Sequence, residues 1–380
     1  MGHRLPSLLI ATLAAYGTTA AQATLPPTGT VTGHVYCADT HTPCRFASVT
    51  LEIAPQPRAS GSDTAKSKPR NYATSTDLDG AFQITGVLPG DYYILARQTG
   101  YFLPYDLAIN EFSDDPVQRA KAIDAVLPRI TVTAGLTTTS VVNLAAGASL
   151  SGTVRFDDGG PASILRLHLY RKDGSGKWKP YLNHSGDPVM APLGLGTHTD
   201  SRGHFTELGL PEGIYCIEIM LPEVVSASDT ITGNPSVTYR VSNNNALRIY
   251  NGDKFRLRDA TPIELREGED RSGIDIVIPT SGLHSLHGLV VAKADGHPIT
   301  EGRVRLLDPD DKSMLRDSSI QPDGTFSFNY LVKGSYLLEI EEAVDTQNDK
   351  TITSYESLTT LLLVEHDITD LRYSLIPAKK

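Results

Sequence analysis

The stretch that decides the fold is Asp79-Gly80-Ala81-Phe82, which Pro89-Gly90-Asp91-Tyr92 follows ten residues later. The same arrangement returns twice, as Arg202-Gly203-His204-Phe205 with Glu212-Gly213-Ile214-Tyr215 and as Asp323-Gly324-Thr325-Phe326 with Lys333-Gly334-Ser335-Tyr336. In each copy the two glycines are ten positions apart, and an aromatic residue stands two positions after each glycine. A fixed pattern that recurs at intervals along a chain is typical of tandem repeats. The sequence therefore predicts an array of one small β unit.

Each copy reads as a hairpin turn, a short strand, a tight turn and a long strand. The glycines can adopt positive φ without steric cost. We expect the aromatic residues to point the same way across paired strands and to anchor the core, where burying each one stabilises the fold by roughly 1.5–3 kcal/mol. The signature residues are Gly80, Phe82, Gly90, Tyr92, Gly203, Phe205, Gly213, Tyr215, Gly324, Phe326, Gly334 and Tyr336.

Strand-like segments flank every copy. Each unit opens with a strand that contains a central glycine, at Gly33, Gly152 and Gly288, and an interior strand glycine marks a bulge or a close approach of two backbones. A strand of alternating polarity and a closing strand complete the pattern. One exception is 117–125, preceded by Asp115-Pro116, which predicts a short capped helix. The fold class is therefore all-β, with three tandem β-sandwich domains.

The 380 residues and the composition suit two or three globular domains. The formal charge of −10 and the pI near 5.5 leave no basic excess for phosphate contacts, so we expect neither a nucleic-acid partner nor binding to an anionic membrane surface.

The N-terminus has the pattern of a cleaved signal peptide over residues 1–23. Arg4 supplies positive charge, an apolar stretch follows, and Ala21-Gln22-Ala23 forms an A-x-A cleavage site. No later apolar stretch approaches the roughly 18 residues of a membrane span, so we expect a secreted chain, periplasmic or extracellular, without a span after cleavage. The expected domains are 24–145, 146–280 and 281–380, joined by the short linkers 145–147 and 279–282.

Cysteine usage fits export. Cys37 and Cys44 bracket a turn-rich loop between strands, and an exported protein should oxidise this pair to a disulfide. Cys216 has no partner, and its position in an alternating strand places it beside Glu218 on the face opposite the core. We expect a free, half-exposed thiol there.

The first unit carries further motifs at Gly33-x-Val35, at Thr76 to Phe82, at Leu88-Pro89-Gly90-Asp91-Tyr92 and at Gly100-Tyr101. With these motifs it resembles the carboxypeptidase regulatory-like domain, a transthyretin-like β-sandwich, and the other two units resemble it more weakly. The resemblance implies a seven-stranded Greek-key sandwich that accompanies peptidases, receptors and secreted surface proteins, and it implies no catalysis. The same fold class includes starch-binding-like modules.

The sequence shows no catalytic constellation, so we expect no enzyme, no cofactor and no metal site. His204 and Glu207 lie on a strand where residues three apart face opposite ways, and Asp77-Leu78-Asp79-Gly80 fits a β-turn better than a calcium loop. The best candidate ligand platform is Trp178, the one tryptophan, together with Tyr170 or Tyr181. An ordinary half-buried aromatic is the competing interpretation of Trp178.

The leading hypothesis is a non-enzymatic secreted spacer that mediates protein interaction at or outside the cell surface. A carbohydrate-binding protein, with a polysaccharide as partner, is the alternative. An accessory chain of a peptidase is the third.

Overall fold

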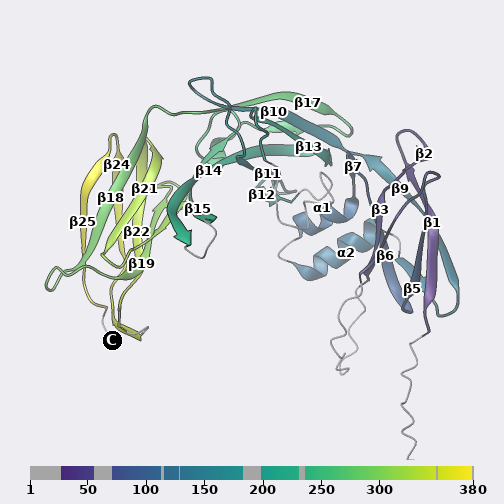
Figure 1. Cartoon of the computed structure of the whole chain (residues 1–380), viewed down its shortest axis with the longest axis horizontal. Coiled ribbons are helices and arrows are strands. Elements are labelled where there is room, and N and C mark those ends of the chain that lie inside the picture. Colours follow the sequence, from purple (N-terminus) through teal and green to yellow (C-terminus); the bar gives the residue numbers. More distant parts are fainter. Residues whose placement is uncertain are drawn as a thin grey trace, which may run out of the picture.

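The computed structural model describes residues 27–54, 71–112, 115–127, 129–182, 198–230, 236–347 and 350–378. The chain is all-β, and three two-sheet sandwiches follow one another along an arch (Figure 1). The expected signal peptide, and the loops 55–70 and 183–196, lie outside the described residues.

The first sandwich also contains both α-helices of the described chain, which lie together beside its second sheet (Figure 1). Its elements are β1 (Gly29–Cys37), β2 (Thr42–Pro43), β3 (Ser48–Ile53), β4 (Tyr72–Ser75), β5 (Ala81–Val87), β6 (Gly90–Arg97), β7 (Tyr101–Phe102), α1 (Pro104–Glu111), α2 (Pro116–Val126), β8 (Arg129–Val132) and β9 (Thr137–Ala146).

The second sandwich contains a long hairpin formed by its fifth and sixth strands. Its elements are β10 (Ala148–Phe156), β11 (Arg166–Lys172), β12 (Trp178–Tyr181), β13 (His204–Leu210), β14 (Gly213–Thr230), β15 (Ser236–Tyr250), the 3-10 helix η2 (Leu257–Asp259), β16 (Ile263–Leu265) and β17 (Asp270–Ile278).

The third sandwich consists of strands alone within the described residues. They are β18 (Leu283–Ala292), β19 (Glu301–Leu307), β20 (Met314–Ser319), β21 (Thr325–Val332), β22 (Gly334–Gln347), β23 (Lys350–Ser354), β24 (Leu358–Val364) and β25 (Ile368–Leu375).

One topology recurs in all three sandwiches. The opening strand (β1, β10 or β18) pairs antiparallel with the strand after the signature turn (β5, β13 or β21) and parallel with the closing strand (β9, β17 or β25). The facing sheet has the orders β4-β3-β6-β8, β12-β11-β14-β16 and β20-β19-β22-β24. The repeated sequence pattern therefore encodes a repeated sandwich of seven common strands.

The recurrent glycine of each opening strand has a structural role that the register explains. Gly33, Gly152 and Gly288 lie directly opposite Phe82, Phe205 and Phe326 on the neighbouring strand. A Cβ atom at Gly288 would overlap the Phe326 ring, and one at Gly152 would overlap the backbone of the parallel strand β17. Glycine therefore allows both the close aromatic packing and the close strand approach.

The two aromatic residues of each copy lie in the same core but belong to facing sheets. Phe82 is on β5 and Tyr92 on β6, and these strands do not pair with each other. The prediction that the two aromatics point the same way across paired strands is therefore wrong, because the short turn between them carries the chain from one sheet to the other. Each tyrosine hydroxyl donates to the carbonyl four residues earlier, from Tyr92 to Leu88 at 3.0 Å, from Tyr215 to Pro211 at 2.8 Å and from Tyr336 to Val332 at 2.7 Å.

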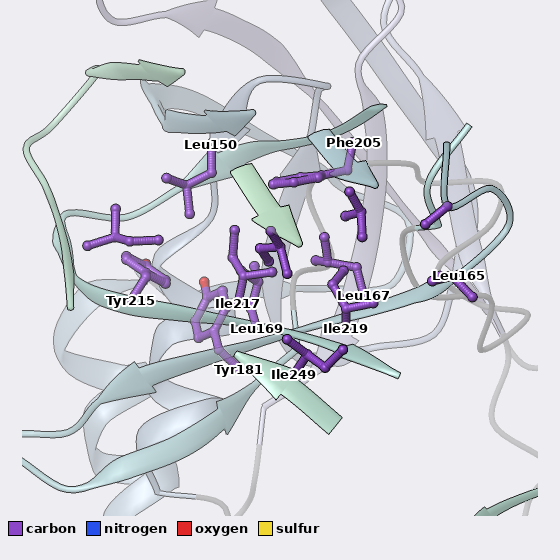
Figure 2. Packing of buried hydrophobic residues seen from close by; sticks show 14 of the residues in the cluster. Leu150, Leu165, Leu167, Leu169, Tyr181, Phe205, Tyr215, Ile217, Ile219 and Ile249 are labelled. Carbon is purple, nitrogen blue, oxygen red and sulfur yellow. The ribbon is translucent and has the colours of Figure 1, made fainter. Parts of the chain in front are cut away.

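The buried side chains of the second sandwich fill the space between its two sheets (Figure 2). Phe205 and Leu150 come from one sheet, and Tyr215, Ile217 and Leu167 come from the other. The cores of the other two sandwiches are also rich in branched aliphatic residues around the signature aromatics. The sheets are thus held by apolar burial, which is the main favourable term in folding.

In every sandwich the connection that follows the long signature strand (β6, β14 or β22) is enlarged. It leads to the next strand of the common topology (β8, β16 or β24). In the first sandwich it contains α1 and α2. The predicted helix is confirmed as α2, and Asp115 caps it by accepting bonds from Val117 N and Gln118 N at 3.0 Å each. The sequence interpretation missed α1, which cannot be recognised from a marked apolar stripe because only Asp106 and Ala108 are buried on it.

Candidate functional site

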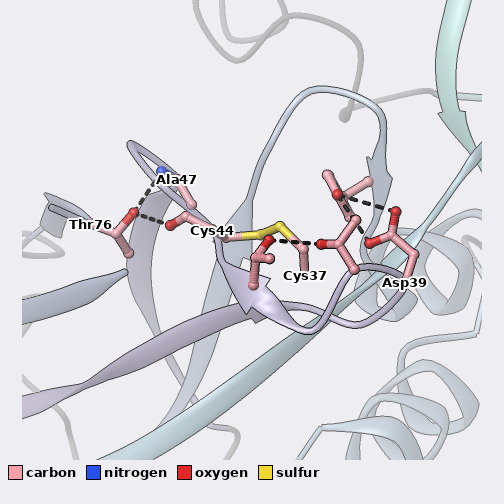
Figure 3. The surroundings of a disulfide bond; sticks show 8 residues. Cys37, Asp39, Cys44, Ala47 and Thr76 are labelled. Carbon is pink, nitrogen blue, oxygen red and sulfur yellow. Dashed lines mark hydrogen bonds between the residues drawn. A yellow bond between two sulfur atoms is a disulfide. The ribbon is translucent and has the colours of Figure 1, made fainter. Parts of the chain in front are cut away.

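The disulfide lies at one end of the first sandwich. Cys37 and Cys44 are bonded, with a Cα–Cα distance of 5.3 Å across the hairpin loop (Figure 3). The buried Thr76 hydroxyl donates to Cys44 O at 2.6 Å and accepts from Ala47 N at 2.8 Å. This loop is therefore tied both covalently and by hydrogen bonds.

The aspartate of each signature turn orders the backbone around the turn glycine. Asp77 Oδ1 accepts from Asp79 N and Ala81 N at 2.9 and 2.8 Å, and Asp200 makes the equivalent pair of bonds at 2.8 Å each. In the third copy Asp323 accepts from the backbone and the hydroxyl of Thr325. These carboxylates act as turn-forming acceptors.

The structure separates the residues of the expected ligand platform. Trp178 and Tyr170 are half-buried on the outer face of the second sandwich, on the paired strands β12 and β11. Tyr181 is 5% exposed and packs edge-on against Tyr215 inside the core. The inclusion of Tyr181 was therefore wrong, because residues 178 and 181 are three apart on one strand and face opposite sides.

Trp178 and Tyr170 line a cleft of about 390 Å³ between the second and third sandwiches. The second sandwich contributes these two rings and Tyr250, and the third contributes the loop after β19, including Ser313. Tyr170 and Tyr250 meet edge to face at 6.2 Å, and the Lys172 ammonium lies 5.0 Å from the centre of the Trp178 ring. We call this space the interdomain cleft.

The buried Glu218 carboxylate accepts hydrogen bonds from two tyrosines that line the interdomain cleft. Glu218 is 1% exposed, and it accepts from the Tyr250 hydroxyl at 2.8 Å and the Tyr170 hydroxyl at 3.2 Å. His168 Nδ1 lies 3.1 Å and Arg248 Nε 3.7 Å from its oxygens. Burial, followed by the charge of Glu218, raises the pKa of both tyrosine hydroxyls, so they remain protonated donors near neutral pH.

Cys216 lies beside Glu218 on the outer face, as its strand position predicts, but the expectation of a half-exposed thiol was wrong. It is fully buried beneath Tyr250 and Ala260, which belong to the enlarged connection of the second sandwich. Burial and then Glu218 raise the pKa of the Cys216 thiol, which keeps it in the unreactive protonated form. It is free of any disulfide.

Ion pairs order the far side of the interdomain cleft. Asp308, 1% exposed, accepts from Arg256 at 3.0 Å and from Arg258 at 2.9 Å. Arg258 also meets Asp310 at 2.6 Å and Asp311 at 3.6 Å. These contacts join η2 and the residues before it to the loop after β19, so the cleft is built from two sandwiches at once.

A buried arginine closes the joint beneath the interdomain cleft. Arg316 on β20 is 4% exposed, and its guanidinium donates to Asn245 Oδ1 at 2.7 and 2.9 Å and to Asn245 O at 2.6 Å. It also donates to Asn329 O on β21 at 2.8 Å, and Asn245 donates to Ser327 O at 3.2 Å. Residues 245 and 316 are 71 positions apart, so local sequence patterns could not reveal the pair.

The joint between the first and second sandwiches is equally close. A single residue, Gly147, separates β9 from β10, and its N–H donates to Gly100 O at 2.9 Å. Asn110 on α1 exchanges two hydrogen bonds with the backbone of Leu182, at 2.8 and 3.1 Å. Leu107 of the same helix packs against the core of the second sandwich. Helix α1 therefore joins the two sandwiches.

The described residues place no group of three or more His, Cys, Asp or Glu side chains where they could hold a metal ion. His204 is exposed and Glu207 is buried, so the two lie on opposite sides of β13. What the interdomain cleft can supply chemically is stacking surface and fixed hydrogen-bonding groups.

No protein-family model and no curated protein matches the chain. Among solved structures, the streptococcal ancillary pilin is similar over 93% of this chain and 99% of its own, with 11% identity and a TM-score of 0.28. The minor pilin of Streptococcus agalactiae is similar over 62% of this chain and 98% of its own, with 13% identity and a TM-score of 0.25. The Bacillus anthracis TIE protein is similar over 92% of this chain, with 13% identity and a TM-score of 0.21, and this chain spans about half (51%) of its length. TM-scores this low carry no argument about the function of this chain.

Among the helices that the structure describes, none is long and apolar enough to cross a membrane.

Proposed function

We propose that this chain is an exported, non-enzymatic spacer that holds surfaces for protein interaction at fixed separations at or outside the cell. The observation that carries the proposal is the buried contact of Arg316 with Asn245, which locks the third sandwich to the second. A spacer differs from a flexible tether in that its joints keep one geometry, and a guanidinium with several fixed acceptors has few alternative arrangements.

The short linkers support the same proposal. Residues 279–282 separate β17 from β18, and Asp157 accepts from the hydroxyls of Thr280 and Ser281 in this linker. A linker tied to the Asp157 side chain of the preceding sandwich cannot act as a free hinge. The ranges 24–145, 146–280 and 281–380 are proposed as the three folding units, since each contains its own pair of sheets and its own core. The first boundary shifts to Gly147, because β9 extends to Ala146 and only Gly147 of the expected linker 145–147 lies between strands.

Export is supported by the disulfide, because such bonds persist in oxidising compartments. The resemblance of the first unit to the carboxypeptidase regulatory-like domain supports a secreted accessory role in general. No observation in the described residues favours a peptidase partner over another protein, so the proposal does not include one.

Small-angle scattering of the mature chain, residues 24–380, tests the spacer proposal. A stiff array predicts that one arrangement of the three sandwiches, the arch of Figure 1, accounts for the scattering curve. If the data require an ensemble of widely differing angles between sandwiches, the chain is a flexible tether and the proposal fails. A variant with eight Gly-Ser residues inserted after Gly282 provides the flexible control.

A further inference from the structure

A spacer requires closed joints, yet the joint between the second and third sandwiches leaves a cleft of about 390 Å³. This volume falls within the range of about 300–1,000 Å³ that is usual for small-molecule sites. We propose that the interdomain cleft binds a neutral oligosaccharide. The proposal goes beyond the spacer function and assigns a chemical class to a ligand of this joint.

The aromatic wall supplies the first requirement of a sugar site. Trp178 and Tyr170 line the interdomain cleft, and the contacts with Lys172 and Tyr250 hold their rings in place. The face of an aromatic ring carries partial negative charge, and the C–H groups of a pyranose ring carry partial positive charge, so the two stack favourably. Large rings with few rotatable bonds also lose little entropy when they bind a ligand.

Fixed polar groups supply the second requirement. Arg258 is 40% exposed while Asp308 and Asp310 hold its guanidinium, and Asp311 and Ser313 lie on the same rim. Sugar hydroxyls both donate and accept, so a rim that presents guanidinium, carboxylate and hydroxyl groups together can satisfy them. Because ion pairs already orient Arg258, Asp308 and Asp311, a ligand need not order these three side chains on binding.

The charge balance selects a neutral ligand. The arginines that line the interdomain cleft are Arg248, Arg256 and Arg258, and their carboxylate partners are Glu218, Asp308, Asp310 and Asp311. An anionic ligand would have to compete with carboxylates already in place, and it would meet no excess of positive charge. A neutral polyol can bond to the outer edges of the same groups without breaking the pairs.

The position of Trp178 provides a direct readout, because it is the one tryptophan of the chain. Mature full-length protein is titrated with maltohexaose, cellohexaose and chitohexaose as neutral probes and with hexagalacturonate as the acidic probe. At least one neutral probe should change the Trp178 emission saturably, with a Kd below about 1 mM, and should protect the ring from acrylamide quenching.

Calorimetric titration of variants locates the site. Trp178→Ala should weaken binding at least tenfold, and Ser313→Trp, which fills the interdomain cleft from an exposed position on the third sandwich, should weaken it as strongly without relying on a buried change. Phe46→Ala removes a 68% exposed aromatic from the first sandwich and should leave binding unchanged.

Three results would overturn the proposal. The first is no saturable response to any of the neutral probes. The second is equal binding by the Trp178→Ala, Ser313→Trp and Phe46→Ala variants. The third is hexagalacturonate binding more tightly than every neutral probe.

Discussion

Removal of the Arg316 guanidinium should loosen the joint between the second and third sandwiches. In Arg316→Met the aliphatic part of the side chain is retained, but Asn245 Oδ1, Asn245 O and Asn329 O lose their charged donor. Asn245 is 4% exposed, so water cannot replace the donor without opening the joint. The converse variant, Asn245→Leu, leaves the guanidinium buried with fewer acceptors.

The expected loss in the free energy of unfolding follows from these contacts. A hydrogen bond that involves a charged group contributes about 1.5–3 kcal/mol, and Arg316 is a charged donor to the neutral Asn245, so each single variant should lose about 2–3 kcal/mol. Replacing both side chains by apolar groups removes the guanidinium and the Asn245 amide together, whereas the bonds from Arg316 to the backbone oxygens of Asn245 and Asn329 are lost in either Arg316 variant, so the double variant should cost less than the sum of the two single variants. The coupling energy reports the two bonds between the guanidinium and Asn245 Oδ1, and it should be about 1–2 kcal/mol.

Urea unfolding followed by Trp178 fluorescence measures the free energy of unfolding of each single variant and of the double variant. Trp178 is a suitable reporter because it lies in the second sandwich beside the joint. Arg166→Met, on the half-exposed β11 strand and away from β20, is the matched control and should change the transition by less than about 0.5 kcal/mol. A coupling energy below about 0.5 kcal/mol would mean that Arg316 and Asn245 act independently, and the reasoning would be wrong.

Three further predictions concern the sandwiches and the linker. Gly288→Ala should destabilise the third sandwich by about 1–3 kcal/mol, since the new methyl group overlaps the Phe326 ring. The control Gly174→Ala, whose new methyl group meets no atom closer than 3.5 Å, should be near neutral, and equal thermal shifts for the two variants would contradict the packing argument. In exported protein, mass spectrometry under non-reducing conditions should find Cys37 linked to Cys44 and one alkylatable thiol, Cys216, only after denaturation; two reactive thiols in the loop 37–44 would refute the pairing. The bonds from Thr280 and Ser281 lower the pKa of Asp157 to about 2, so its stabilisation of the linker is fully present above the unfolded value of about 3.9 and is lost as the pH falls to about 2. Carboxyl NMR titration should show an Asp157 midpoint near that value, and a midpoint of about 3.9 would mean that the hydrogen bonds to the linker do not form. Asp157→Asn should remove this part of the acid sensitivity, whereas Asp158→Asn should not.

Much of the sandwich can be predicted from local pattern. The glycine and aromatic spacings mark turns and core positions because φ > 0 and aromatic burial are local demands on single residues. Gly80, Gly203 and Gly324 have φ between 72° and 81°, and their turns are ordered by the aspartates that precede them. Strand parity also places Cys216 on the correct face.

The candidate site is less predictable because distant segments form it. The outer face of β14 at Cys216 is buried by Tyr250 and Ala260, which lie more than 30 residues further along the chain. The residue pattern of β14 itself gives no indication of this burial. Arg316, Asp308 and Arg258 read as ordinary surface charges until the third sandwich is placed against the second. The position of Tyr181 is a local property, since its spacing of three residues from Trp178 on β12 indicates the opposite face of the sheet.

The central claim is that the three sandwiches keep one mutual arrangement, and distances between spin labels test it most directly. In a Cys216→Ala background, the exposed residues Gln83, Thr206 and Thr359 are replaced by cysteine in the pairs 83/206 and 206/359, which report the first and second joints. Pulsed dipolar spectroscopy should give one narrow distance distribution for each pair, and Arg316→Met should broaden the second alone. Broad distributions for both pairs in the otherwise unmodified chain would contradict the account.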